Sequence, residues 1–209
     1  MPSSVDPHSL TDRLHAEVHG HAPQAIIFDC DGTLAHSMPA HYVAWRNTLE
    51  PHGVEFLESK FYSLAGMPSD RIINLLSDEQ GIELDADRLA EEKEERFLET
   101  LHLLEPIIPV VALAKTSAGK LPIAVASGGF REIIQHQLTQ IEIRHLFEVI
   151  VTAEDTERHK PEPDVFLEAA RQLAIDPTEC CVLEDSDLGI TAAKRAGMSW
   201  VDVRPYCPS

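Results

Sequence analysis

The chain has 209 residues, enough for one sizeable core with a small insertion. Hydrophobic residues make up 44% and charged residues 25%, which is typical of a globular domain and excludes collagen-like, coiled-coil and disordered classes. With 17 Lys and Arg against 35 Asp and Glu, the formal charge is −18, so nucleic acid and anionic membrane surfaces are excluded as expected partners.

The remaining global features predict a cytoplasmic protein. The four cysteines, at positions 30, 180, 181 and 207, show no C-x-x-C spacing, so we expect reduced thiols. The sequence has no apolar run of 18 residues, and residues 1–22 lack the apolar stretch of a signal peptide. This segment fits either an extra helix or a mobile tail. We expect a monomer or a weak dimer.

The first predicted strand leads directly into acidic residues. Gln24–Phe28 is a short apolar, β-rich run that ends just before Asp29, so a buried strand carries carboxylates into a turn. Residues 39–104 then show no strand pattern, and turn signals divide them into four predicted helices: His41–Pro51, Leu57–Leu64, Ser69–Gln80 and Asp85–Leu103. The last helix contains the charge-rich run Glu91–Arg96, which is typical of a solvated face with room for one inward lysine.

The second half alternates strands and helices. Near-continuous apolar runs predict the strands Leu121–Ala126, Val149–Thr152, Cys180–Leu183 and Trp200–Val203. Helical patterns lie between them at Phe130–Gln137, Pro163–Leu173 and Leu188–Ala196. We therefore predict an α/β core with a parallel sheet covered on both faces. The expected division is an N-terminal extension (1–22), a core (23–38 and 105–209) and a four-helix insertion (39–104).

Four residue clusters follow four of these strands, at the sheet edge where ligands bind in open α/β folds. The first contains Asp29, Asp31 and Gly32. A carboxylate can attack phosphorus, and a second carboxylate two residues later can transfer the leaving group's proton. The glycine allows the sharp turn that aims both. A calcium loop is the alternative, but its closing Glu is missing, because position 40 is Ala.

The second and third clusters are ambiguous when taken alone. Ser127 with Gly128 and Gly129 offers a hydroxyl and backbone N–H groups to an anion, although, taken alone, the cluster is better explained as an N-cap serine in a glycine turn. Lys160, held in the Pro-rich segment 159–163, can place an ammonium against a phosphoryl group, although it also fits an ordinary surface loop.

The fourth cluster predicts a metal. Glu184 and Asp185 are adjacent carboxylates at a strand end, where a hard cation would relieve their repulsion. Mg²⁺ is favoured because it takes few carboxylates and bridges to substrate phosphate. Such a cation with one or two lysines would reverse the local potential for a small phosphorylated substrate. A capping pair on the next helix is the alternative.

Together these residues resemble the haloacid dehalogenase superfamily, whose first motif reads D-x-D-G-T. The resemblance spans residues 25 to 205 and implies a Rossmann-like three-layer core with a helical cap inserted after the first strand. It implies Asp29 as nucleophile and Asp31 as general acid and base, with Ser127 and Lys160 on the phosphoryl oxygens. The implied Mg²⁺ ligands are Asp29, the Asp31 carbonyl and the pair Glu184–Asp185.

The insertion is similar to the cap of beta-phosphoglucomutase-like proteins and sugar-phosphate phosphatases. His41 falls where this subfamily places a histidine that steers Asp31, Trp45 where it places an aromatic residue, and Lys93 where a cap lysine meets the substrate. A core or surface histidine is the alternative for His41. The full expected substrate-binding set is His41, Trp45, Gly66, Arg71, Lys93 and Gly128.

Two positions depart from the pattern of these relatives, and the first departure favours simple hydrolysis over a mutase. The mutase has an arginine three residues after the cap glycine, but here Ser69 follows Gly66 at that spacing, and Arg71 lies two positions later, about 200° around a helix. His36 replaces an acidic residue that often follows the first motif. We therefore expect a Mg²⁺-dependent phosphatase that hydrolyses a small phosphate monoester, a sugar monophosphate, through an aspartyl-phosphate intermediate. The alternatives are a mutase, a non-catalytic binding module and a dehalogenase.

Overall fold

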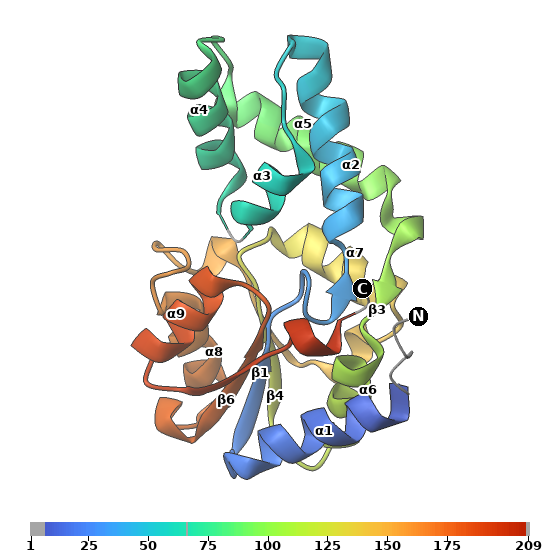
Figure 1. Cartoon of the computed structure of the whole chain (residues 1–209). Helices are drawn as coiled ribbons and strands as arrows, with labels where there is room; N and C mark the ends of the chain where they lie inside the picture. The colour runs from blue at the N-terminus through green and yellow to red at the C-terminus, as the bar shows by residue number, and fades with distance from the viewer. Residues whose placement is uncertain (1–6, 66, 208–209) are drawn as a thin grey trace.

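The computed structural model describes residues 7–65 and 67–207, which form an α/β core with a set of helices above it (Figure 1). Five parallel strands make the central sheet in the order β5-β4-β1-β6-β7. Their bounds are Ala25–Phe28 (β1), Ile123–Ala126 (β4), Val149–Val151 (β5), Cys180–Glu184 (β6) and Ser199–Asp202 (β7). The predicted parallel sheet is confirmed.

Both faces of the sheet are covered, because side chains alternate along each strand. In β1, Ile26 and Phe28 face one apolar cluster, and Ala25 and Ile27 face another. The helices of the first cluster are α1 (Pro7–Gly20), α6 (Ile108–Ser117) and α7 (Arg131–Gln140). Those of the second are α8 (Asp164–Leu173) and α9 (Asp187–Arg195). Because the five strands are parallel, their carboxyl ends lie at one edge of the sheet.

The described part of the N-terminal extension is a helix packed on the core. Leu14 and Val18 of α1 are fully buried in the cluster shared with α6. Tyr206 donates a hydrogen bond to Glu17, and Arg13 lies 5.8 Å above the Tyr206 ring. Of the two alternatives left by the sequence, an extra helix or a mobile tail, residues 7–20 therefore form the helix.

The chain leaves the core through β2 (Ala35–His36) and returns through β3 (Glu105–Pro106), which pair antiparallel. Between them lie four helices that we call the cap: α2 (Met38–Leu49), α3 (Glu58–Ser63), α4 (Ser69–Gln80) and α5 (Ala86–Glu99). They enclose an apolar cluster of their own around Leu49, Ile73, Leu76 and Leu89. Figure 1 shows the cap above the edge of the sheet where β1 and β4 end.

The first and last residues of two cap helices differ from the predicted ones by a few positions. α2 starts three residues before the predicted His41, because Pro39 occupies the first turn, where its missing N–H costs nothing. α5 ends at Glu99 and is followed by a 3₁₀ turn. The 3₁₀ turns are Glu50–His52, Leu101–Leu103, Arg144–Leu146, Ala153–Asp155, Pro177–Glu179 and Arg204–Tyr206.

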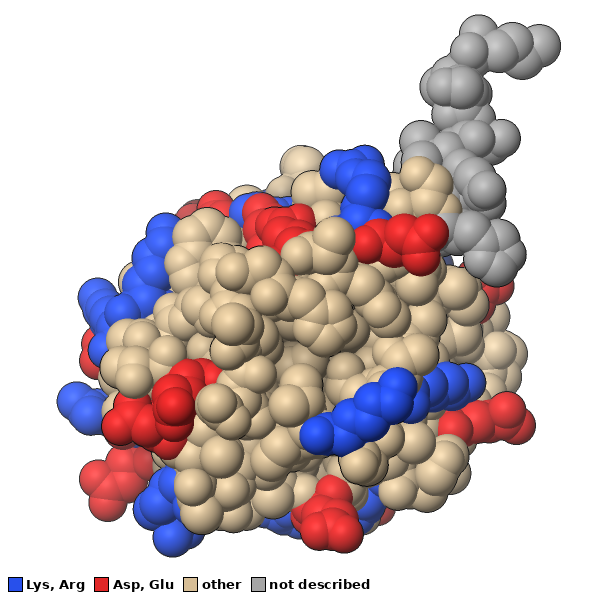
Figure 2. Space-filling model, turned by 90° about the horizontal axis from the view of Figure 1, so that it is seen from below, with Lys and Arg blue, Asp and Glu red and all other residues tan. Residues whose placement is uncertain are grey.

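The surface opposite the cap shows no concentration of one charge. Figure 2 views the core from below, and on its described residues Lys and Arg are interspersed with Asp and Glu. Such mixing is ordinary for a solvated face. No helix in residues 7–65 or 67–207 is both long and apolar enough to cross a membrane.

Candidate active site

The first motif forms a tight loop at the end of β1. The Cys30 carbonyl accepts hydrogen bonds from the N–H groups of Leu34 (2.9 Å) and Ala35 (3.0 Å). Gly32 has φ +75°, and a Cβ there would lie 2.1 Å from Oδ2 of Asp185. Glycine is therefore required twice, by the backbone conformation and by the close approach of the fourth motif.

Three buried charges meet beside this loop. Lys160 Nζ lies 2.6 Å from Oδ1 of Asp29 and 2.7 Å from Oε2 of Glu184. Burial would lower the pKa of Lys160, but the two carboxylates outweigh it and hold its pKa above the usual range. Burial and the charge of Glu184 raise the pKa of Asp29 to about 8 despite this ammonium. One lysine therefore leaves the cluster short of positive charge.

Asp185 completes a carboxylate set that fits a hard cation. Oxygen atoms of Asp29, Glu184 and Asp185 lie within 4.8 Å of one another. Burial, then the charges of Glu184 and Asp29, raise the pKa of Asp185 well above its usual range. Thr33 donates to Oδ1 of Asp185 at 3.2 Å. Carboxylate oxygens are the ligands that Mg²⁺ prefers, and a divalent ion would offset the excess negative charge.

Glu184 differs from the other two carboxylates in its partners. Its Oε1 accepts from the N–H and the hydroxyl of Ser186, at 2.9 and 2.7 Å, and from the Asp185 N–H at 3.2 Å, while Oε2 binds Lys160. In the described residues no hydrogen bond reaches Oδ2 of Asp29 or of Asp185. These two oxygens are therefore the best placed to hold a cation, with Glu184 orienting the lysine.

Asp31 points away from this cluster and toward the cap. Its Oδ1 accepts three hydrogen bonds, from Ser37 Oγ (2.6 Å), His41 Nε2 (2.8 Å) and Gln137 Nε2 (2.8 Å). Burial would raise the pKa of Asp31, but His41, Ser37 and Gln137 together hold its pKa below the usual range. Asp31 is therefore ionised in this state.

A lysine on the cap sets the tautomer of His41. Lys93 Nζ is buried and lies 3.0 Å from Nδ1 of His41 and 2.9 Å from Oε1 of Glu94. An ammonium group only donates, so Nδ1 accepts and Nε2 carries the proton that His41 donates to Asp31. The ring of Phe97 stacks on His41 at 3.8 Å, and Trp45 lies 5.6 Å from Lys93 Nζ. The cap thus holds Asp31 through one histidine.

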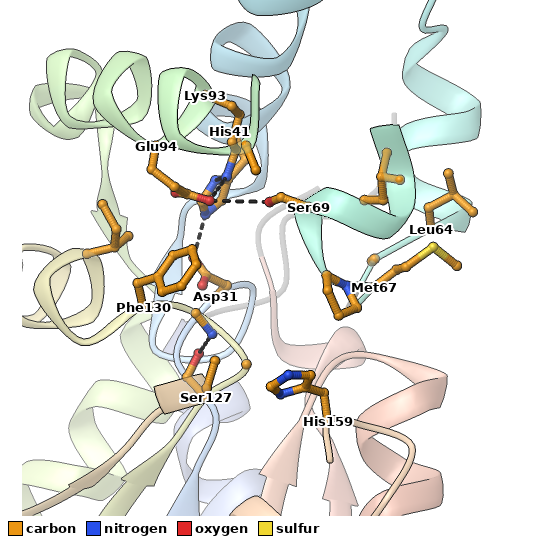
Figure 3. A pocket seen from close by; sticks show the side chains of 18 of the residues that line it. Asp31, His41, Leu64, Met67, Ser69, Lys93, Glu94, Ser127, Phe130 and His159 are labelled. Carbon is orange, nitrogen blue, oxygen red and sulfur yellow. Dashed lines mark hydrogen bonds and ion pairs between the residues drawn. The ribbon is translucent and has the colours of Figure 1, made fainter. Parts of the chain in front are cut away.

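Ser127 presents a hydroxyl from the end of β4. It is 2% exposed, and its Oγ accepts from the N–H of Gly129 at 3.1 Å. Because the oxygen is already an acceptor, its proton is free to be donated to an anion. Figure 3 shows Ser127 and Asp31 on the floor of the pocket, with His41 and Lys93 above them.

A cavity of about 660 Å³ lies between cap and core and brings most of the predicted site together (Figure 3). Ten predicted residues line it: Asp29, Asp31, His41, Trp45, Lys93, Ser127, Gly128, Lys160, Glu184 and Asp185. Arg71 does not line it, but borders a separate pocket of about 300 Å³ beside residues 157–162. Ser69 lines the main cavity. Gly66 lies outside the described residues.

Sequence reasoning did not single out several residues that line this cavity or contact Asp31. Gln137 carried one usable signal, a polar residue within the apolar stripe of Ile133, Ile134 and Leu138 on α7. Phe130 is 47% exposed and borders the cavity, but an aromatic residue after two glycines has no specific meaning in a sequence. The residues missed are Glu94, Phe130 and His159, which line the cavity, and Ser37 and Gln137, which donate hydrogen bonds to Asp31.

The arrangement is a Rossmann-like α/β core with a helical cap over the carboxyl edge of its parallel sheet. The family model of haloacid dehalogenase-like hydrolases matches residues 26–203. The chain belongs to this family, and the resemblance identified from the four motifs is confirmed.

Individual relatives agree with this placement. Over 180 residues the chain is 38% identical to the fructose-1-phosphate phosphatase YqaB of Escherichia coli. The aligned region covers 86% of this chain and 95% of that protein. It is 27% identical to the beta-phosphoglucomutase of Bacillus subtilis, over 86% of this chain and 83% of the relative. A hydrolase structure from Pseudomonas syringae matches with a TM-score of 0.77 and 27% identity, over 85% and 83% of the two chains.

Proposed function

We propose that this protein is a Mg²⁺-dependent phosphatase that hydrolyses a small sugar monophosphate through an aspartyl-phosphate at Asp29. The observation that carries the proposal is the pairing of two differently held carboxylates in one cavity. Asp29 lies against Lys160 and the acidic set, whereas Asp31 is held by donors from the cap and α7. This difference supports Asp29 as the nucleophile and Asp31 as the group that transfers protons.

The residues of the chain supply each step of this reaction. Asp29 attacks phosphorus in line, while Lys160 and Ser127 stabilise the charge on the phosphoryl oxygens. The bond to the ester oxygen breaks, and this oxygen takes a proton from Asp31, which must first acquire one because it is ionised in this state. Water then attacks the aspartyl-phosphate and gives a proton back to Asp31. Bound Mg²⁺, held by Asp29 and Asp185, would supply further neutralisation of the phosphoryl charge.

The charges on the cap favour a monophosphate. Its cavity-lining residues include Asp70, Asp87, Glu91 and Glu94, and among the described ones Lys93 is the sole lysine or arginine that the cap contributes. That ammonium already contacts His41 and Glu94. Carboxylates accept hydrogen bonds from sugar hydroxyls but repel a second phosphate. This arrangement, with Arg71 outside the cavity, favours hydrolysis over a mutase that must hold a bisphosphate.

The names of relatives point to the same substrate class. YqaB is named a fructose-1-phosphate phosphatase, and another relative, 31% identical over 178 residues, is the hexitol phosphatase A of Escherichia coli. We therefore propose that the substrate of this chain is likewise a phosphorylated sugar or sugar alcohol. The cavity of about 660 Å³ is large enough for such a ligand.

The test is a panel of phosphate esters assayed with and without Mg²⁺. It should include ketose 1-phosphates, hexose 6-phosphates, hexitol phosphates, phosphoglycolate and a hexose bisphosphate, with free phosphate and sugar products measured together. We expect Mg²⁺-dependent phosphate release, fastest from the sugar monophosphates. Isomerised sugar phosphate formed only with a bisphosphate primer would establish a mutase instead. Absence of turnover of every ester would refute both.

A further inference from the structure

We propose that Gln137 is a positioning residue that fixes the acid–base carboxylate of Asp31 from the core side. This inference rests on the proposed function, since it assigns a role within the same reaction. Its basis is the convergence of three donors on a single oxygen of Asp31, one of which comes from a helix that is not part of the cap.

The three hydrogen bonds divide the carboxylate into a held oxygen and a free one. Ser37, His41 and Gln137 all donate to Oδ1, within 2.6 to 2.8 Å. No hydrogen bond to Oδ2 occurs within residues 7–65 and 67–207. Rotation of the carboxylate would break all three contacts, so Oδ2 is the oxygen that is presented for proton transfer.

Gln137 is held in place on both sides of its amide. The side chain is fully buried, on the face of α7 that also carries Ile134 and Leu138. Its Oε1 lies 3.7 Å from the thiol of Cys30, the residue between the two catalytic carboxylates, which leaves Nε2 facing Asp31. A buried amide is costly unless its polar atoms are paired, so this glutamine is stable here because of Asp31.

The origin of Gln137 gives it a role that the other donors lack. Ser37 and His41 lie in the segment that enters the cap, so their positions follow the cap. Gln137 lies 106 positions after Asp31, on a helix packed against the central sheet. Its hydrogen bond therefore comes from the core, although α7 also contacts α5 of the cap, and we expect it to keep Oδ1 in register while substrate enters and product leaves.

The experiment compares Gln137→Met with Gln135→Met, the same substitution at an exposed site on the same helix. Methionine is close in size but cannot donate. The readout is kcat/KM for a sugar monophosphate and for p-nitrophenyl phosphate, because kcat/KM reports transfer to Asp29 and departure of the leaving group. The sugar oxygen needs a proton, whereas the aryl oxygen leaves well without one. We expect Gln137→Met to lower the sugar ester value roughly 10- to 100-fold and the aryl ester value less than about threefold. Gln135→Met should change neither.

Two further measurements separate positioning from a general structural effect. In an Asp31→Asn background, Gln137→Met should cause no additional loss on the sugar ester, because the group it positions is already inactive. If Gln137→Met does not fold, Gln137→Asn provides the same test, since an amide shortened by about 1.5 Å no longer reaches Asp31. Equal losses on both esters, or additive losses with Asp31→Asn, would overturn the proposal. Wild-type protein without activity on either ester would instead refute the proposed function.

Discussion

Lys160 compensates the negative charges of the two carboxylates that are buried at the base of the site. It contacts Asp29 and Glu184 at once, and all three side chains are almost fully buried. Removing one partner from such a cluster leaves charges without compensation in a medium of low dielectric constant. The same contact fixes the position of Asp29 before any substrate arrives.

The variant Asp29→Asn should lose activity and keep its structure. The amide has nearly the same shape and its oxygen still accepts from Lys160, but it cannot attack phosphorus. We expect kcat to fall at least ~10³-fold, with a melting temperature within a few degrees of wild type. Circular dichroism and steady-state kinetics check this, with the exposed Asp78→Asn on α4 as control. Substantial remaining Mg²⁺-dependent turnover would remove Asp29 from the nucleophile role.

The variant Lys160→Met should be unstable as well as inactive. We expect the free energy of unfolding in EDTA to fall by about 3 to 5 kcal/mol, because Asp29 and Glu184 lose their buried partner. Urea denaturation measures this, and Lys115→Met, at an exposed lysine on α6, should be close to neutral. An unfolding free energy equal to wild type would show that the pair does not stabilise the fold.

At this scale the sequence predicted the residues of the motifs but not their partners. Asp29, Ser127, Lys160 and Asp185 each follow a strand that could be recognised from its apolar run, so their meeting at one edge was predictable. Gln137 was not, because its contact with Asp31 depends on how α7 is rotated and packed. Hydrophobic periodicity gives the buried face of a helix but not which polar group it meets.

Among the elements, α9 packs its first turn against the end of β6. Ser186 caps this helix by accepting from the N–H of Gly189 at 3.0 Å, and it also binds Glu184. A Cβ on Gly189 would lie 2.1 Å from both Cδ and Oε2 of Glu184. The helix can approach the strand this closely only because position 189 has no side chain.

The substitution Gly189→Ala should therefore damage the site from outside it. Glu184 is 1% exposed and has four hydrogen-bond donors, so it cannot move aside without loosening Lys160. We expect a loss of stability of about 1 to 3 kcal/mol from overpacking, together with a fall in kcat. Chemical denaturation and kinetics test this. Gly20→Ala, with open space around its Cβ at the end of α1, should be neutral or slightly stabilising, and equal behaviour of the two variants would contradict the packing argument.

Some helices and strands could be predicted from the sequence, and others could not. The bounds of α4 agree with the predicted Ser69–Gln80, because a proline precedes this helix and Gly81 ends it. The strands β2 and β3 have two residues each, too few to show a period, and went unpredicted. α6 was missed because its sequence is almost uniformly apolar, so it shows no helical alternation. The helix α1 could not be distinguished from a tail until its contacts with α6 were known.

For the whole molecule, the formal charge of −18 and the cluster of buried carboxylates both attract a divalent cation. Mg²⁺ binding should therefore stabilise the folded protein. We expect the melting temperature to rise with added Mg²⁺. The free energy of unfolding should increase by about 2.7 kcal/mol when the Mg²⁺ concentration is one hundred times its dissociation constant. Thermal scans in EDTA and in Mg²⁺ measure this, and Asp185→Asn should remove most of the gain. A gain unchanged in that variant would place the ion elsewhere.

The architecture was more predictable than the relation between its parts. Alternating apolar runs and helices lead to a parallel sheet by general rules of packing, and the sheet has that form. The division of the chain at residues 39 and 104 stays a prediction. How the cap is oriented, and that it places carboxylates rather than a second cation in the cavity, depends on contacts between helices distant in sequence.

The hydrogen bond from His41 to Asp31 joins a residue of the cap to a residue of the core. An ester with an organic part too bulky for the space between them would still bind by its phosphoryl end, yet it would hold the histidine away from the carboxylate. Such a compound would occupy the enzyme without being turned over and would behave as a competitive inhibitor. Discrimination by size would then be seen in the turnover number more than in the affinity.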